Sequence, residues 1–154
     1  MQSTDWVTLG LLLLAVIIET RRGSLTAWTD AVGLIVGLRA ADYIYPAIVS
    51  EALTAGRAYL LICLSFLVLV GLISWQVQTA TAKYSGPVDR MAGAFAGLLV
   101  GLTLSYGMFH YVLYTWGRHV PAYNQSLFRP LVHDFTWLEA LVDKLAGVGV
   151  AVGR

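Results

Sequence analysis

Long apolar stretches separated by short polar turns dominate the 154 residues of the chain. A helix needs about 20 mostly apolar residues to cross a bilayer, and the pattern predicts four such segments. The clearest is the third, residues 58–77, which carries no formal charge. Tyr59 and Trp75 lie near its two ends, where amphipathic rings prefer the membrane interface. We therefore expect an all-α membrane protein with four transmembrane helices.

The second and fourth predicted spans have recognisable boundaries. The fourth follows Gly86-Pro87, a turn that puts proline at the first helical position, and runs from about residue 91 to 116. Asp89 then lies beside the positive end of that helix dipole. The second span runs over residues 25–45, and Pro46 is expected to end it, because proline removes a backbone donor and crowds the preceding turn.

The first predicted span is the shortest of the four. It is apolar only over residues 6–18, which is roughly 20 Å of helix against a hydrocarbon core of about 30 Å. A cleaved signal peptide fits less well, because Asp5 rather than a basic residue precedes the apolar run and no small-residue cleavage site follows it. We expect a short, retained span, with a re-entrant segment as the alternative.

The chain changes character after the fourth span, which divides it into a transmembrane part, 1–117, and a remainder, 118–154. Residues 119–134 contain two prolines and are predicted to form a loop. Residues 136–139 have the capping-box pattern of a helix start. Apolar residues then recur at helical spacing: Leu138, Leu141, Val142 and Leu145. We expect a short amphipathic helix at the membrane interface, followed by a short tail.

Composition and charge agree with this assignment and exclude two other classes. Apolar residues make up 58% of the chain and charged residues only 12%, against about 25% charged in soluble domains. Disorder is excluded, since it requires low hydrophobicity and high charge. Nucleic acid is not an expected partner, because the net charge is only +1 and no basic run is present. The expected partner is the lipid bilayer, and the lone Cys63 forms no intramolecular disulfide.

The most specific local pattern is a ridge of small residues in the fourth span. Gly93, Gly97, Gly101 and Ser105 recur every fourth position and therefore share one face of a helix. In lipid, small residues let helix backbones approach and gain van der Waals contact. The ridge therefore predicts close helix packing, either with another span of the same chain or with a second copy. For the chain as a whole we expect a homo-oligomer or a membrane-protein partner.

Charged residues within or beside the spans are the next candidates, since an ionisable group at membrane depth is costly and often functional. Asp30 and Arg39 are nine positions apart on one helix and face opposite sides, so they cannot pair with each other. Spacing of three residues gives Arg39 a partner in Asp42 and gives Glu19 a partner in Arg22. Asp30 is expected near Arg21, Arg22 and Arg90. Interfacial pairing is one interpretation; a polar pathway or proton-coupled site built from Asp30, Arg39 and Glu19 is the other.

His110 is the candidate ligand for a cofactor. A histidine within a membrane span can bind a haem or chlorophyll-type metal, but no second histidine lies on another span to complete a bis-histidine site. An interfacial hydrogen-bonded histidine is therefore the favoured interpretation, and neither a cofactor nor a metal site is expected. The sequence contains no hydrolase, zinc-protease or nucleotide-binding motif. We therefore expect no catalytic residues and no enzymatic activity.

The order of these residues resembles the CvpA family, the colicin V production proteins of bacterial inner membranes. The resemblance rests on Asp5-Trp6, on Arg22-Gly23 between the first two spans, and on the end of the second span from Arg39-Ala40 to Tyr45-Pro46. Its most specific element is Asp89-Arg90 followed by the glycines of the fourth span, and Ser126 to Leu131 resembles the loop after it. Glu19 departs from the pattern, in which a small residue is expected.

The resemblance implies a four-span protein of the bacterial inner membrane, linked to toxin export and envelope tolerance. On that basis we expect a non-enzymatic protein that acts through helix packing and partner interaction. One alternative is an accessory subunit of a respiratory or photosynthetic complex that holds a cofactor or a lipid near His110. A second alternative is a small channel or proton-coupled transporter that uses Asp30 and Arg39.

Overall fold

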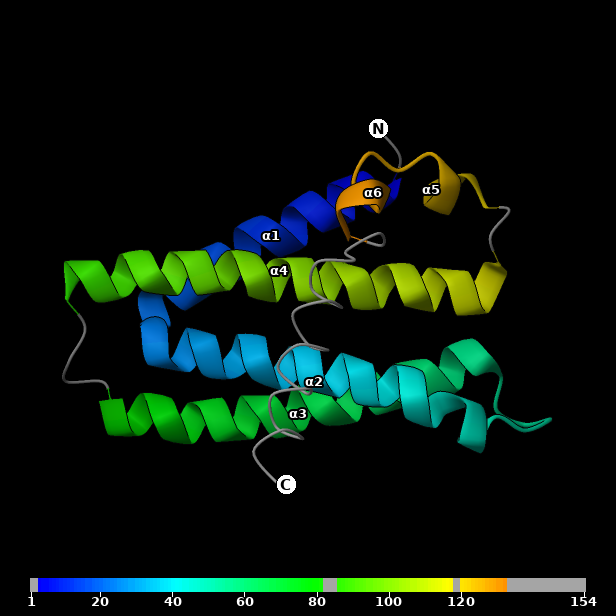
Figure 1. The fold of residues 1–154 in the computed structure, drawn as a ribbon, viewed down its shortest axis with the longest axis horizontal. Coiled ribbons are helices and arrows are strands. Elements are labelled where there is room, and N and C mark those ends of the chain that lie inside the picture. Colours follow the sequence, from blue (N-terminus) through cyan, green and yellow to red (C-terminus); the bar gives the residue numbers. More distant parts are fainter. Residues whose placement is uncertain (1–2, 82–85, 118–119, 133–154) are drawn as a thin grey trace, which may run out of the picture.

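The computed structural model describes residues 3–81, 86–117 and 120–132, and the regular structure within these ranges is entirely helical (Figure 1). Four long helices follow one another along the chain: α1 (Ser3–Arg22), α2 (Ser24–Ile48), α3 (Ala55–Thr81) and α4 (Pro87–Trp116). Each is long and apolar enough to cross a membrane. The predicted all-α membrane fold with four spanning helices is therefore confirmed.

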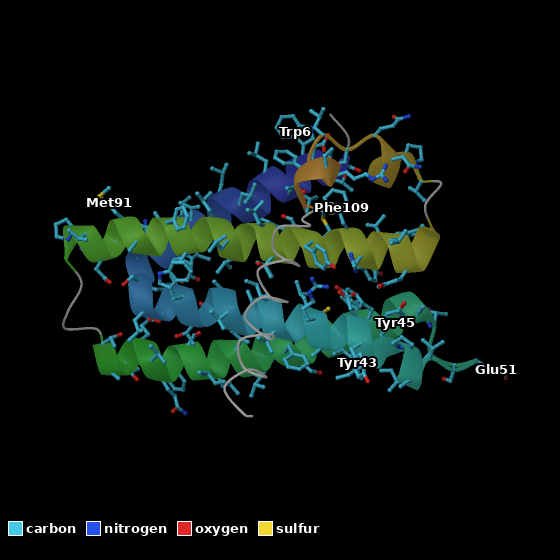
Figure 2. The ribbon with its side chains drawn as sticks, in the orientation of Figure 1. Trp6, Tyr43, Tyr45, Glu51, Met91 and Phe109 are labelled. Atoms are coloured by element: carbon cyan, nitrogen blue, oxygen red, sulfur yellow. The ribbon has the colours of Figure 1, made fainter. Side chains whose placement is uncertain are left out.

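The four helices run alternately up and down, so that each connection joins antiparallel neighbours (Figure 1). α1 packs mainly on α4, whereas α2 packs on both α3 and α4. α1 and α2 are joined by Gly23 alone. We call the end of the bundle where α1 meets α2 the Arg22 end, and the opposite end the Tyr45 end. Figure 2 shows Met91 at the Arg22 end and Tyr43, Tyr45 and Glu51 at the Tyr45 end.

The structure corrects two helix boundaries. α1 has 20 residues, about 30 Å at 1.5 Å per residue, so the first span is the shortest but is a full-length helix. The apolar pattern shortened it because Thr4 and Asp5 before the run and Glu19 after it are polar, yet all three are buried against the rest of the protein. Pro46 does not end the second span: it lies inside α2, which continues to Ile48.

The segment after α4 also differs from its predicted form. Two single-turn helices, α5 (Pro121–Asn124) and α6 (Arg129–Val132), interrupt what the sequence predicted to be a loop. They cover the start of α1 and part of α4 (Figure 1). The predicted amphipathic helix over residues 136–145 lies outside the described residues.

The ridge of small residues on α4 is the surface on which α1 packs. A side-chain carbon added at Gly97 would lie 2.9 Å from Cα of Val16, and one added at Gly101 would lie 2.8 Å from Cα of Leu12. At Gly93 the nearest atom is the backbone oxygen of Glu19, at 2.7 Å. These distances leave no room for any larger residue. Of the two possibilities left open by the sequence, the ridge therefore makes its contact within the chain.

Candidate functional site

A buried ionic cluster joins three helices at the Arg22 end. Arg22 Nη1 donates to Glu19 Oε1 at 3.1 Å and to Asp30 Oδ2 at 2.5 Å. Its Nε donates to the side-chain oxygen of Gln78 at 3.3 Å, and the Ser74 hydroxyl donates to Asp30 Oδ1. One guanidinium thus links α1 to α2, and the two polar side chains of α3 complete the cluster.

The two carboxylates of this cluster are almost completely shielded. Glu19 is 3% exposed and Asp30 is 6% exposed, whereas the Arg22 side chain is 22% exposed. Charges withdrawn from water require partners, and here two carboxylates share one guanidinium. The second oxygen of Glu19, Oε2, is buried and has no hydrogen-bond partner. The cluster is therefore held together by charge but leaves one acceptor unsatisfied.

Sequence spacing predicted part of this cluster. The Glu19–Arg22 pair follows from their separation of three residues, and Asp30 lies beside Arg22, one of the three arginines near which it was expected. Ser74 and Gln78 were missed, because they belong to α3 and nothing in the sequence fixes how α3 is positioned against α2. Arg39 lies nine residues beyond Asp30 on α2, toward the other end, so the structure does not bring these two candidates together.

Asp89 fastens the start of α4 to the start of α2. Its Oδ1 accepts a hydrogen bond from the Ser24 backbone N–H at 3.0 Å and another from the Ser24 hydroxyl. The first N–H groups of a helix lack partners within it and carry partial positive charge, so a carboxylate there is favourable. The sequence assigned Asp89 to its own helix dipole; the structure shows that it also caps α2. Arg90, its neighbour in the motif, is exposed.

Gly23 allows Asp89 to come close to the start of α2. It has φ of +91°, a conformation that disfavours side chains, and a side-chain carbon there would lie 2.6 Å from Asp89 Oδ2. Arg22, Gly23 and Asp89, all residues of the family resemblance, thus form one junction between α1, α2 and α4. Gly23 and Asp89 position the helices, and Arg22 holds the ionic cluster together.

A second polar cluster lies at the Tyr45 end and includes His110. The Nδ1 atom of His110 is 2.9 Å from Asp42 Oδ1. The hydroxyls of Tyr106 and Tyr114 donate to the same carboxylate at 3.3 and 3.4 Å. The His110 ring packs on Tyr106 with ring centroids 4.1 Å apart. The sequence offered Asp42 as a partner for Arg39 and missed its contacts with α4. The structure surrounds this carboxylate of α2 with side chains of α4.

Asp5 connects the beginning of α1 to the segment after α4. It is fully buried and accepts hydrogen bonds from the Ser126 hydroxyl at 2.5 Å and from the Leu127 backbone N–H at 2.9 Å. Figure 2 shows Trp6 at the start of α1, next to this contact. Phe128 packs nearby on the buried Phe109 of α4. Both ends of the four-helix unit are therefore closed by carboxylates that bridge separate elements.

Among the openings between the described helices are two grooves. One, of about 260 Å³, lies between α3 and α4 over α2 and is walled by apolar side chains with Tyr59 and Cys63 among them. The other, of about 240 Å³, has walls of α1 and α3 and reaches Glu19, Arg22 and Asp30. Across the ranges that the structure describes, no three His, Cys, Asp or Glu side chains lie close enough to hold a metal ion.

Comparison with known families decides the assignment that the residues suggested. The profile of the family described as colicin V production protein matches residues 4–136, which include all four long helices. The chain belongs to the colicin V production protein family. The resemblance to CvpA proteins drawn from Arg22, Gly23 and Asp89 is thereby confirmed. Searches of curated proteins and of solved structures gave no significant match.

Proposed function

We propose that this CvpA-family chain is a non-enzymatic protein of the bacterial inner membrane that supports toxin or protein export, or envelope homeostasis, through interaction with a membrane partner. The observation that carries the proposal is the family match over residues 4–136. The match covers the complete four-helix unit rather than one motif, so the function attached to the family concerns the membrane part as a whole.

The polar geometry supports a role in assembly rather than in catalysis. Asp5, Asp42 and Asp89 each accept hydrogen bonds from another element, and Asp30 binds both Arg22 and Ser74. Carboxylates used in this way position helices.

Complementation tests the export proposal. The chain would be expressed in a bacterial strain that lacks its own CvpA-family member, and colicin V export and tolerance to envelope stress would be measured. We expect the wild type to restore both, and the Gly97→Leu variant, whose packing on Val16 is blocked, to restore neither. Wild-type protein that reaches the inner membrane without restoring either property would contradict the proposal.

A partner would be identified by purification in a gentle detergent followed by mass spectrometry of the proteins that accompany the chain. The proposal predicts either a second copy or a component of the export apparatus. α3 offers the most open face for such a contact, with Leu61, Val68 and Leu72 each more than half exposed. A strictly monomeric protein purified without companions would count against it.

We further propose that no haem or pigment is bound at His110. Asp42 lies at the Nδ1 of this histidine and Tyr106 covers a face of its ring, which favours a hydrogen-bonded structural role. A visible absorption spectrum of the purified protein tests this directly. Absorption only in the ultraviolet is expected, whereas a Soret or chlorophyll band that disappears in His110→Phe would establish the cofactor-binding alternative.

The geometry gives less support to a channel or proton-coupled transporter that uses Asp30 and Arg39. Asp30 is engaged by Arg22 and Ser74 at one end of the bundle, and Arg39 lies further along α2. Flux measurements in liposomes test this alternative. We expect no proton flux beyond that of protein-free vesicles; a pH-dependent flux that Asp30→Asn abolishes would establish transport.

A further inference from the structure

The groove between α1 and α3 has apolar walls and a charged end, and helix packing alone does not account for it. α1 packs on α4 and α3 packs on α2, so α1 and α3 have little or no direct contact. The space between them is walled by apolar side chains, among them Leu14 and Ile18 of α1 and Leu67 of α3, and it measures about 240 Å³. It faces the region that lipid occupies around the bundle.

One end of this groove is polar. Glu19, Arg22 and Asp30 form part of its lining. Glu19 is 97% shielded from solvent, and its Oε2 has no hydrogen-bond partner. Arg22 uses Nε and Nη1 for Gln78, Glu19 and Asp30, which leaves Nη2 without a partner among the described residues. The groove therefore ends in an unsatisfied acceptor beside an available cationic donor.

With the four long helices spanning the bilayer, the polar end falls near the lipid headgroups. Glu19 is within the last turn of α1, three residues before the helix ends. Leu11, which lines the deep part of the groove, is eight residues earlier, about 12 Å closer to the middle of the bilayer at 1.5 Å per residue. The groove thus begins where phosphate and ammonium groups of lipids reside and continues along the depth of their acyl chains.

We propose that this groove is a binding site for one phospholipid with a primary ammonium headgroup, of the phosphatidylethanolamine type. An acyl chain occupies the apolar walls, the phosphate accepts from Arg22 Nη2, and the ammonium donates to Glu19 Oε2. Two carboxylates against one guanidinium leave one negative charge, which favours a headgroup carrying an ammonium over an anionic headgroup without one.

The groove is smaller than a transmembrane helix of a partner would need in order to lie within its walls. A helix about 10 Å wide fills roughly 900 Å³ over 12 Å of its length, whereas all the empty space of the groove, counted out to its open side, is about 680 Å³. A single acyl chain is much thinner and needs no hydrogen bond along its length. Lipid is therefore the occupant that fits both the volume of the walls and the charges at the end.

Native mass spectrometry of the delipidated full-length protein, mixed with equal amounts of phosphatidylethanolamine and phosphatidylglycerol, tests the proposal. The wild type is expected to retain one phosphatidylethanolamine. Gly71→Leu should lose it, because Gly71 lines the groove and an added side chain there meets no atom within 4 Å, so that it fills the groove without disturbing helix packing. Gly10→Leu is the matched control, since Gly10 is equally open but does not line the groove.

Glu19→Gln separates the headgroup contact from the chain contact. Losing the charged acceptor is expected to reduce the preference for phosphatidylethanolamine about tenfold, while Gly71→Leu reduces binding of both lipids. Circular dichroism and a monodisperse elution profile establish that each variant is folded. Retention of lipid by Gly71→Leu at the wild-type level would overturn the site, and equal binding of both lipids by the wild type would overturn the headgroup assignment.

Discussion

Gly23 fixes the junction of three helices through the absence of its side chain. Its φ of +91° reverses the chain between α1 and α2, and the space where a side-chain carbon would lie is occupied by Asp89 Oδ2. The Asp89 carboxylate can then accept a hydrogen bond from the Ser24 N–H, one of the N–H groups at the start of α2 that lack a partner within the helix. Backbone geometry and hydrogen bonding at this position therefore depend on each other.

Gly23→Ala is expected to destabilise the protein by about 2 kcal/mol, because alanine disfavours positive φ and its Cβ collides with Asp89. The measurement is the free energy of unfolding in mixed micelles, titrated with sodium dodecyl sulfate. Gly10→Ala is the control: it meets no neighbour within 4 Å and should stabilise α1 slightly. Equal stability of the two variants would refute this role of Gly23.

Asp30→Ala is expected to lower the free energy of unfolding by about 3 kcal/mol, the lower end of the range for removing one partner of a buried ion pair. The effect should stay at that lower end because Arg22 keeps Glu19 as a partner. The same micelle titration measures it. The control is Glu51→Gln, on the exposed connection between α2 and α3, which should change stability by less than about 0.5 kcal/mol. A similar loss of stability in the Asp30 and Glu51 variants would show that the ionic cluster around Arg22 does not stabilise the fold.

At the scale of whole helices, the small-residue ridge of α4 is where sequence and structure agree best. A repeat of small residues every fourth position specifies a contact face, because that spacing follows the helix period. It does not specify which helix fills the face. The partner became clear only from the packing of Gly97 on Val16 and of Gly101 on Leu12.

Gly97→Leu is expected to prevent α1 from packing, because the added side chain would begin 2.9 Å from a backbone atom that cannot move aside. We expect a loss of more than 3 kcal/mol in unfolding free energy, in the range of strongly destabilising substitutions. Gly10→Leu serves as the control, since the same side chain there meets open space. A stable Gly97→Leu variant that merely loses an oligomeric state would indicate that the ridge faces a second copy.

The limits of sequence-based prediction for this fold have physical causes. Apolar length identified all four spans, yet it shortened α1, because a polar residue such as Asp5 was assumed to face water when it is in fact buried. Hydrogen bonds between distant elements left no local signal: Asp5 and Ser126 are 121 residues apart. Of the ionic cluster, only contacts within one turn or across the short α1–α2 junction could be predicted.

At the scale of the whole molecule, carboxylates close both ends of the bundle. Asp89 and the Arg22 cluster act at one end, while Asp42 and Asp5 act at the other. In a membrane the hydrophobic effect contributes little between helices, so such polar contacts and close packing determine which helices associate. The segment after α4 becomes part of the membrane unit through Asp5.

Ser126→Ala is expected to loosen that segment. Removing the hydroxyl leaves Asp5 buried with fewer donors, which costs about 1–3 kcal/mol locally. Amide hydrogen exchange in peptides from residues 120–132 should therefore accelerate about tenfold or more, whereas peptides from α3 should be unchanged. Thr29→Ala, which removes only a bond to the carbonyl of its own helix, is the control. Unchanged exchange in 120–132 would show that Asp5 does not hold the segment.

The central claim, that α1 packs on the ridge of α4 within one chain, has a direct test. Gly97 of α4 packs on Val16 of α1, and Gly101 packs on Leu12. One helical turn further along the same interface, Thr8 lies opposite Ser105, and both are fully buried. In a Cys63→Ala background, Thr8→Cys combined with Ser105→Cys should form a disulfide in native membranes upon oxidation. A crosslinked monomer is predicted; a disulfide-linked dimer, or no crosslink in a folded protein, would contradict the account.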